Sequence, residues 1–309
     1  MSLMQTLKVY ELFDSAFASG QTVVDLLKDY PAVEVSVECV AGPKGKTDFV
    51  KVLIPGAQGK RNGGQTPTLG IVGRLGGVGA RPVRIGLVSD ADGAIAAMAA
   101  ALKLAHMQTQ GDTLPGDVIL TTHICPDAPT RPHEPVDFMD SPVNTEDLCQ
   151  REVTPEMDAV LSIDTTKGNR VLNHKGFAIS PTVKEGYILR VSEDLLRIME
   201  MTSGLLPVTF PVTTQDITPY GNNIFHINSI MQPSIATSAP VVGVAISAQS
   251  AVPGCGTGAS HEVDIAGVAR FCIEVAKEFS RGTCRFLDEP EYRRLLSLYG
   301  SMTHLQKRQ

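Results

Sequence analysis

Residues 86–105, GLVSDADGAIAAMAAALKLA, decide the fold, because an apolar run meets two carboxylates and then the most alanine-rich stretch of the chain. The apolar run, PVRIGLVS at 82–89, predicts a buried strand, and the alanine-rich stretch predicts a helix from about residue 93 to residue 110. Asp90 and Asp92 lie between the two segments. We interpret Asp92 as the helix cap, which leaves Asp90 free to bind a cation.

The same alternation of strand and helix patterns continues along the chain, and it is typical of a mostly parallel sheet with helices on both faces. Strand patterns occur in PTLGIVGRL (67–75), GDVILTTHIC (116–125), DAVLSIDTT (158–166), LPVTFPV (206–212) and APVVGVAISA (239–248), and helix patterns in SEDLLRIMEMTSG (192–204) and DIAGVARFCIEVAKEFSRG (264–282). We therefore expect a three-layer α/β sandwich with a mostly parallel, mixed central sheet, formed by one domain over residues 1–309 without a separate lid domain. Residues 1–66 predict helices and a hairpin packed on that domain.

Composition narrows the classes of function. The formal net charge of -6, the absence of a basic stripe and the lack of tryptophan argue against a nucleic-acid partner. No apolar segment approaches the roughly 20 residues of a membrane span. The start, MSLMQTLKVYELF, lacks the pattern of a secretory signal, and the cysteines are scattered without CxxC spacing. We expect a cytoplasmic protein that has no membrane partner.

Four of the strand patterns lead into side chains that can hold a cation. In open α/β sheets, ligands bind at the carboxyl ends of the strands, where helix N-termini also point inward. The side chains at these positions are Asp90, His123 and Asp127 in HICPD, Asp164, and His261 beyond a glycine-rich loop. Carboxylates and imidazoles from several strand ends are typical of zinc or manganese hydrolase sites, so we expect one or two such ions.

Each of these residues also has a purely structural interpretation. Asp164 could form a turn, although a carboxylate after an almost wholly apolar strand is costly to bury without a cation or several donors. His123 could be a hydrogen-bonded structural histidine, and His261 could close its loop. Among the other histidines, His226 in YGNNIFHIN is the best candidate for a site.

Nucleotide binding and serine-hydrolase chemistry are disfavoured. The glycines of GIVGRLGGVGARP (70–82) precede a predicted strand rather than the helix that a dinucleotide fingerprint requires, so we expect no nucleotide cofactor. No GxSxG motif occurs in the sequence. Cys125 lies two residues after His123, a separation that suits a shared orientation along a strand better than a catalytic pair.

The order of these segments resembles that of the co-catalytic zinc exopeptidases, the aminopeptidase and aminoacylase-carboxypeptidase group, over nearly the whole chain. The similar segments are SDADGAIAAMAAALKL (89–104) to their metal-bridging aspartate and its helix, AVLSIDTT (159–166) to their third metal aspartate, and SHEVDIAGVARFCIEVAKEF (260–279) to their terminal metal histidine and last helix. A narrower resemblance links GRLGGVGARP (73–82), TTHICPDAPTRPHEP (121–135) and TTQDITPYGNN (213–223) to a bacterial family known as a domain of unknown function. The resemblance implies a zinc-exopeptidase-like, phosphorylase/hydrolase-like fold.

The chain departs from the peptidase pattern at two places. Arg74 stands where those peptidases have a ligand histidine, and HICPD (123–127) stands where they have a pair of glutamates. An arginine in a metal position repels a cation. Two expected ligands and the expected general base are therefore missing, unless His123 or Asp127 substitutes for them.

We expect a metal-dependent hydrolase of peptide or amide bonds in a small substrate, such as a peptide or an amino-acid derivative. The resemblance implies that Asp90 bridges the metal and that Asp164 and His261 are terminal ligands. His123 or Asp127 then completes the site or acts as the base. A bound metal ion would acidify water enough for attack at neutral pH.

The alternative is a non-catalytic relative that uses the same pocket to bind a small molecule, with Arg74 holding an anion such as a carboxylate. In both cases Arg74, Cys125 and His226 are the predicted substrate-binding residues. A homo-oligomer is compatible with either function. The presence or absence of bound metal distinguishes the two hypotheses.

Overall fold

The computed structural model describes residues 2–74, 77–133, 137–252 and 254–307. The sheet contains β1 (Glu34–Gly42), β2 (Gly45–Ile54), β3 (Leu69–Gly73), β4 (Val118–Ile124), β7 (Ala159–Thr165), β8 (Gly176–Ile179), β9 (Val183–Lys184), β10 (Tyr187–Ile188) and β11 (Val241–Ser247), and the short β5 (Thr130–Arg131) and β6 (Phe138–Met139) pair separately. The strand order is β1-β2-β4-β3-β7-β11-β9-β10, with β8 also paired to β11. The central strands β4, β3, β7 and β11 are parallel to one another, and the flanking strands pair antiparallel.

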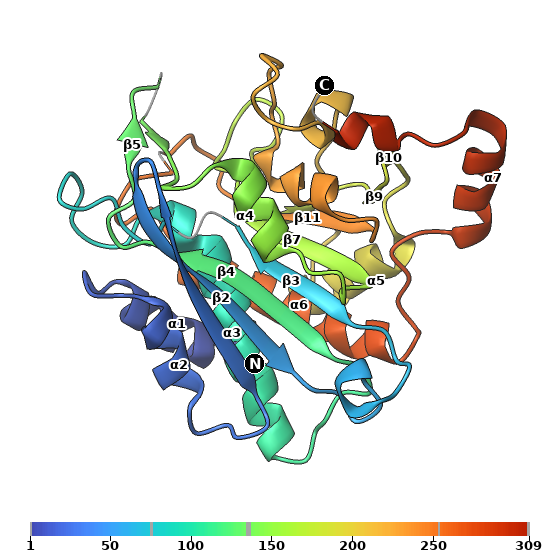
Figure 1. Cartoon of the computed structure of the whole chain (residues 1–309), viewed down its shortest axis with the longest axis horizontal. Coiled ribbons are helices and arrows are strands. Elements are labelled where there is room, and N and C mark those ends of the chain that lie inside the picture. The colour runs from blue at the N-terminus through green and yellow to red at the C-terminus, as the bar shows by residue number, and fades with distance from the viewer. Residues whose placement is uncertain (1, 75–76, 134–136, 253, 308–309) are drawn as a thin grey trace.

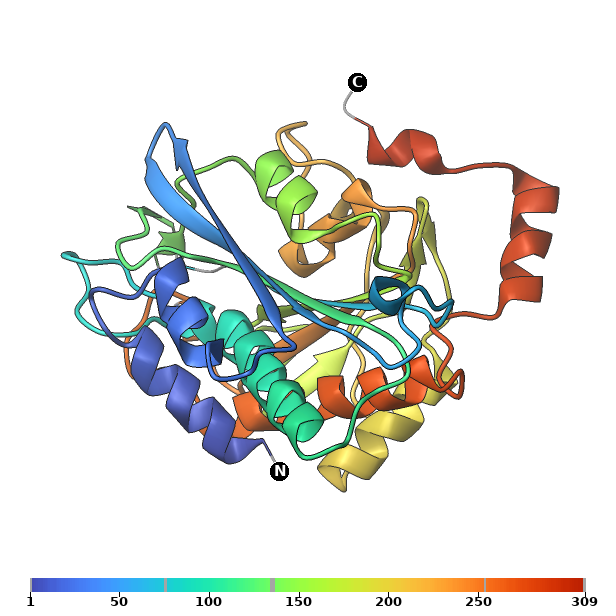
Figure 2. The ribbon, with the colours of Figure 1, turned by 60° about the horizontal axis from the view of Figure 1, so that its bottom comes forward.

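Helices cover both faces of this sheet, as Figure 1 and Figure 2 show. The α-helices are α1 (Leu3–Phe13), α2 (Gly20–Leu27), α3 (Asp92–Thr109), α4 (Thr145–Glu152), α5 (Glu193–Ser203), α6 (Glu262–Ser280) and α7 (Glu289–Tyr299), and the 3-10 helices are η1 (Lys60–Asn62), η2 (Ser89–Ala91), η3 (Thr214–Ile217), η4 (Ser229–Ala236) and η5 (Thr303–Gln306). In Figure 2, α1, α3, α5 and α6 lie below the sheet, and α4 and η4 lie above it. The expected three-layer α/β architecture with a mostly parallel mixed sheet is therefore confirmed.

The central helix α3 explains the alanine-rich stretch. It contacts β3, β4 and β7 on one side and α1 and α6 on the other, and every one of its alanines is buried. The closest approach is to β3, where a Cβ on Gly73 would lie 2.6 Å from the carbonyl oxygen of Gly93 and 2.9 Å from the Cα of Ala94. Small residues on all sides of α3 therefore allow this helix to lie deep inside the molecule.

The N-terminal region contains the helices α1 and α2 and the hairpin of β1 and β2. The helix α1 packs on α3 and α6, and α2 packs on β1 and β2. The hairpin of β1 and β2 extends the main sheet, because β2 pairs antiparallel with β4 over Asp48 to Ile54. Among the described helices, none combines the length and the apolar composition needed to cross a bilayer.

Two predicted strands are wrong. Residues 82–89 form turns and bends with only an isolated bridge between Val88 and Thr257, and the side chain of Ile85 is 85% exposed. Residues 206–212 likewise make only an isolated bridge, between Thr209 and Ile179. Prolines in both segments remove backbone donors that a strand needs, so the apolar composition alone misled the prediction.

We expect Gly73→Ala to destabilise the fold by about 1–3 kcal/mol, because the new methyl group would collide with the backbone of α3. Chemical denaturation measures this change in the free energy of unfolding. Gly267→Ala in α6 is the matched control, since its Cβ would meet only Phe177 at 3.9 Å and alanine gains up to about 1 kcal/mol of helix propensity. Equal stability of the two variants would contradict the close approach of α3 to β3.

Candidate functional site

The carboxyl ends of β3, β4 and β7 lie side by side, and the N-terminus of α3 meets them there. Arg74 follows β3, and its backbone N–H donates to the carbonyl of Ile163, the residue before Asp164. His123 lies near the end of β4. The structure thus places His123 and Asp164, two of the five predicted strand-end residues, at one edge of the sheet together with Arg74.

Asp90 lies against the backbone of a loop that follows β11. Its N–H donates to the carbonyl of Gly254 at 2.8 Å, and a Cβ on Gly254 would lie only 2.2 Å from Asp90 Oδ1. The residue is 7% exposed. Burial raises the pKa of the Asp90 carboxyl to about 8, and the negative charges of Asp164 and Asp92 raise it further than the ammonium of Lys167 lowers it.

Asp164 is buried beside Arg74 and lacks a full set of donors. Its Oδ1 accepts a hydrogen bond from the N–H of Thr165 at 2.7 Å, and its buried Oδ2 has no hydrogen-bond partner among the described residues, although the Ser229 hydroxyl lies close enough to lower the pKa of the carboxyl. Burial raises the pKa of the Asp164 carboxyl to about 7, although the guanidinium of Arg74 opposes this shift. Asp90 and Asp164 thus form a pair of buried carboxylates, hereafter the acid pair, which a proton or a cation would stabilise.

Asp92 does not cap α3, which corrects the prediction from the sequence. It is the first residue of the helix, and its fully buried carboxylate points into the surrounding loops. Ser260 Oγ donates to Asp92 Oδ1 at 2.5 Å, and Lys167 Nζ lies 3.2 Å from Oδ2. The reason is electrostatic, since a buried ion pair with a lysine compensates the charge more fully than orphan backbone donors at a helix start.

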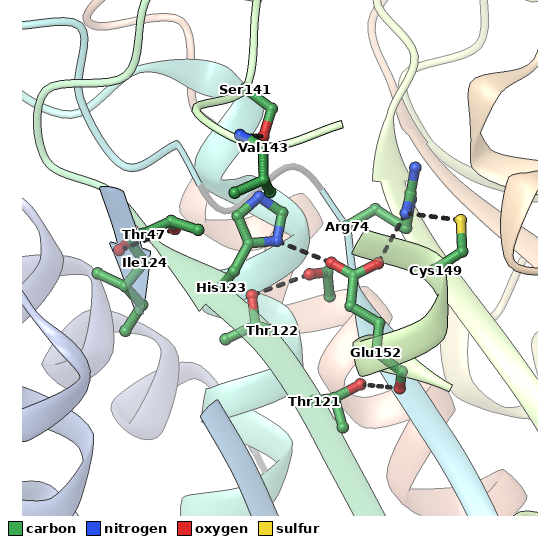
Figure 3. Close-up of polar contacts among 11 residues, drawn as sticks. Thr47, Arg74, Thr121, Thr122, His123, Ile124, Ser141, Val143, Cys149 and Glu152 are labelled. Carbon is green, nitrogen blue, oxygen red and sulfur yellow. Dashed lines mark hydrogen bonds and ion pairs between the residues drawn. The ribbon is translucent and has the colours of Figure 1, made fainter. Parts of the chain in front are cut away.

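A second buried network joins Arg74, Glu152 and His123 on the α4 face of the sheet (Figure 3). Glu152 Oε2 lies 2.6 Å from Arg74 Nη1, and its Oε1 lies 2.7 Å from His123 Nδ1. All three residues are buried: Glu152 is 0% exposed, Arg74 is 1% exposed and His123 is 2% exposed. Burial alone would raise the pKa of Glu152, but Arg74 and His123 outweigh it and lower that pKa. Glu152 in turn keeps the pKa of the Arg74 guanidinium above its ordinary value.

The sequence predicts that Arg74 binds substrate, but in the structure its guanidinium is buried and faces Glu152 rather than solvent.

The sequence analysis missed two charged residues of the site, Glu152 and Lys167. Glu152 comes from α4 rather than from a strand end, so no positional rule pointed to it. Lys167 carried a usable signal, because it follows the Asp164 strand end by three residues.

The other predicted residues lie around this centre. Asp127 is exposed beyond β4 and accepts a hydrogen bond from Cys125 Sγ at 3.6 Å. The ring of His226 lies 4.4 Å from the ring of Tyr220. His261 is exposed immediately before α6, and its charge lowers the pKa of Asp92.

The donor set decides which cation fits. Within the described ranges, no three side chains of His, Cys, Asp or Glu are grouped so that they could hold a metal ion. A zinc site with three protein ligands therefore does not fit these residues. The buried Asp164 Oδ2, which has no hydrogen-bond partner among the described residues, is an atom of the acid pair that offers a free oxygen ligand, the kind that hard cations such as Mn²⁺ prefer.

Comparisons with known proteins agree with this fold. A model of the family "protein of unknown function (DUF1177)" matches residues 38–309, and a search of curated proteins finds no match. The bottromycin maturation enzyme BotP in complex with Mn is 13% identical, with a TM-score of 0.57 over 89% of this chain and 71% of that chain. Tomato leucine aminopeptidase is 10% identical, with a TM-score of 0.55 over 88% and 61% of the two chains, and an Acidobacteriales bacterium glutaminyl cyclase is 13% identical, with a TM-score of 0.53 over 91% and 94%.

These likenesses show the fold alone, because the identities are low. They confirm the zinc-exopeptidase-like architecture that the sequence resemblance implied. This chain spans 61% of the tomato enzyme and 62% of the leucyl aminopeptidase from Trypanosoma cruzi, and so lacks a large part of their length.

We expect Glu152→Gln to destabilise the protein by about 3–5 kcal/mol, because it leaves the buried charge of Arg74 without a counter-ion. Urea denaturation at pH 7 measures the loss. Arg151→Ala is the matched control, since the neighbouring Arg151 pairs with Glu38 at the surface and such pairs contribute about 0–1 kcal/mol. A loss below about 1 kcal/mol for Glu152→Gln would contradict a charged, buried Arg74.

The acid pair also predicts a pH dependence of stability. Because the folded-state pKa values of about 8 for Asp90 and about 7 for Asp164 exceed the ordinary value of 3.8, the folded state holds protons that the unfolded chain releases. Stability should therefore fall as pH rises from about 4 to about 8 and then level off.

Asp90→Asn should remove part of this fall. We expect its melting temperature to exceed that of the wild type at pH 9 and to differ little at pH 4, in buffers free of divalent ions. Asp25→Asn on the exposed face of α2 is the control and should follow the wild type at both values. A wild-type curve that rises between pH 5 and pH 8 in parallel with Asp90→Asn would contradict the assignment.

Proposed function

Because this chain belongs to the DUF1177 family of proteins of unknown function, we propose its function from the geometry of its own site. The protein is proposed to be a metal-dependent hydrolase that cleaves a peptide or amide bond in a small substrate. The observation that carries this proposal is the acid pair, in which Asp90 and Asp164 are buried at the meeting point of α3 and the strand ends.

The acid pair supports a cation site because the two nearest cationic side chains are paired with other carboxylates, so the negative charge of the acid pair is not balanced. Lys167 is paired with Asp92, and Arg74 is paired with Glu152. Asp90 and Asp164 thus have no ion-pair partner of their own among the described residues. In the proposed enzyme they hold one divalent cation, manganese in preference to zinc, with water and substrate as the remaining ligands.

The other residues of the site position groups for hydrolysis. When bound, the cation would polarise the substrate carbonyl and acidify a water molecule. Glu152 fixes the imidazole of His123 through Nδ1, the arrangement that orients a histidine base, so His123 is favoured over the exposed Asp127 as the base. Asp92 and Ala259 hold the ammonium of Lys167 near the acid pair, where it can stabilise negative charge.

The second candidate function is small-molecule binding without catalysis. It is favoured by the two internal cations, because Arg74 acts on Asp164 and Lys167 acts on Asp90, and both compete with a metal ion for these acids. The contact of 2.6 Å between Arg74 and Glu152 argues against the predicted role of Arg74 in this second function, because an anion held by Arg74 would have to displace Glu152. Metal binding therefore separates the two functions.

The test measures manganese binding and hydrolysis in the same samples. Calorimetric titration of the wild type with MnCl₂ at pH 7.5 should give one ion per chain, and Asp90→Asn and Asp164→Asn should each weaken binding at least about tenfold, or about 1.4 kcal/mol. Hydrolysis of a mixture of dipeptides and amino-acid amides, followed by mass spectrometry, should depend on added manganese. Asp25→Asn should match the wild type in both assays.

The outcomes separate the hypotheses. Manganese binding that needs Asp90 and Asp164, together with cleavage, supports the hydrolase. Binding without cleavage of any amide in the mixture would contradict the hydrolase and leave the binding protein. Absence of manganese binding in the wild type, or equal binding by the two variants, would overturn the site itself.

A further inference from the structure

A cavity of about 420 Å³ lies between the start of α4 and the end of η4. This volume is in the range of small-molecule sites. Its walls combine apolar groups, including Ile235 and the ring of Tyr220, with the polar side chains of Glu146, Gln306 and Lys307. Such a lining suits a small molecule that has one apolar side and one polar or charged side.

The floor of this cavity adjoins the buried network described above. Cys149 lines the cavity, and its Sγ lies 3.7 Å from Arg74 Nη1. Tyr220 lines it from the opposite side, and both Arg74 and Asp164 act electrostatically on the Tyr220 hydroxyl, whose pKa burial raises to about 12. A molecule in the cavity would therefore lie next to the centre of the site.

The last described residues, 302–307, form a segment that we call the strap, and its Gln306 and Lys307 line one side of the cavity. In Figure 1, α7 (red) stands away from the body, and the chain after it returns over the top of the molecule. Gln306 Nε2 donates to the carbonyl oxygens of Ser234 at 2.5 Å and Thr237 at 3.3 Å. In the part of the chain that is described, no other strap side chain hydrogen-bonds to the body.

Within the described residues, the strap is held by the two hydrogen bonds of Gln306, by contacts of η5 with η4, and by Met302, whose carbonyl oxygen would lie 2.3 Å from a Cβ on Gly186. Segments with few buried contacts open locally at small cost while the rest of the fold stays closed. Opening here would expose Cys149 and Tyr220, which are far from each other in sequence but share the cavity.

We infer that the strap is a closing segment of this cavity, which releases at Gln306 to admit a small molecule with an apolar and a polar side. The inference goes beyond the proposed hydrolase and does not require a metal ion. According to this inference, a small molecule reaches the region of Arg74 past the C-terminal strap rather than from the carboxyl edge of the sheet.

The thiol of Cys149 provides the readout. Iodoacetamide, a small neutral reagent, is added to the full-length protein at fixed pH, and the rate of modification of each cysteine is measured by peptide mass spectrometry. In the wild type, the exposed Cys39 should react fast, Cys149 slowly and the fully buried Cys272 not at all. Gln306→Ala should raise the Cys149 rate about tenfold, as expected from the loss of these hydrogen bonds.

Two further variants sharpen the test. A chain ending at Ser301 lacks the strap and should show a Cys149 rate at least as high as Gln306→Ala. His304→Ala changes an exposed strap residue that makes no hydrogen bond to the described body, and its Cys149 rate should equal that of the wild type.

Several results would overturn the inference. These are a wild-type Cys149 that reacts as fast as Cys39, an unchanged Cys149 rate in both Gln306→Ala and the shortened chain, and an equal gain in His304→Ala. A simultaneous gain at Cys149 and Cys272 would show global rather than local opening and would also count against the strap. Because none of these readouts involves manganese or cleavage, they are independent of the proposed function.

Discussion

The close contact of α3 with β3 and β7 is the constraint on which both the fold and the site depend. Gly73 and Gly93 have no side chains where the two elements meet, so the helix lies directly on the strand ends. The short turn before the helix then brings Asp90 close enough to Asp164 for the charge of Asp164 to raise its pKa. Larger side chains on α3 would hold it farther from the sheet and would separate the two carboxylates.

Charge balance is the second organising principle of this region. Four buried carboxylates share two cationic side chains, and these residues are Asp90, Asp92, Glu152, Asp164, Arg74 and Lys167. Glu152 and Asp92 each take one cation at short distance. Burial raises the pKa values of Asp90 and Asp164, and it raises that of Asp92 as well, although the ammonium of Lys167 opposes the shift. The site is therefore asymmetric, because only Glu152 has a pKa lowered by its cationic neighbours, and Asp90 and Asp164 have no ion-pair partner within the described chain.

The sequence predicts the parts of the site that follow from topology. Asp164 was selected because side chains at the carboxyl ends of parallel strands meet at one edge. Asp90 was selected as the end of a strand at 82–89 that the structure does not contain, and it lies instead in the 3-10 turn η2 before α3. Glu152 and Lys167 were not selected, since their positions depend on how α4 and a loop pack, and no periodic pattern encodes that packing. The same limit explains the false strand at 82–89, whose apolar side chains lie at the surface. A sequence pattern predicts a helix or strand well when local backbone preferences determine its structure. It predicts poorly when packing against neighbouring elements determines that structure.

The glycine at position 254 has an evolutionary consequence. Its missing Cβ leaves room for the carboxylate oxygen of Asp90, which would otherwise be 2.2 Å from a methyl group. Glycine and alanine codons differ by a single base, so one mutation would fill the space beside this acid while leaving the sheet and helices intact. Lineages that share this scaffold could therefore lose or regain the proposed ion site through a change in one loop residue.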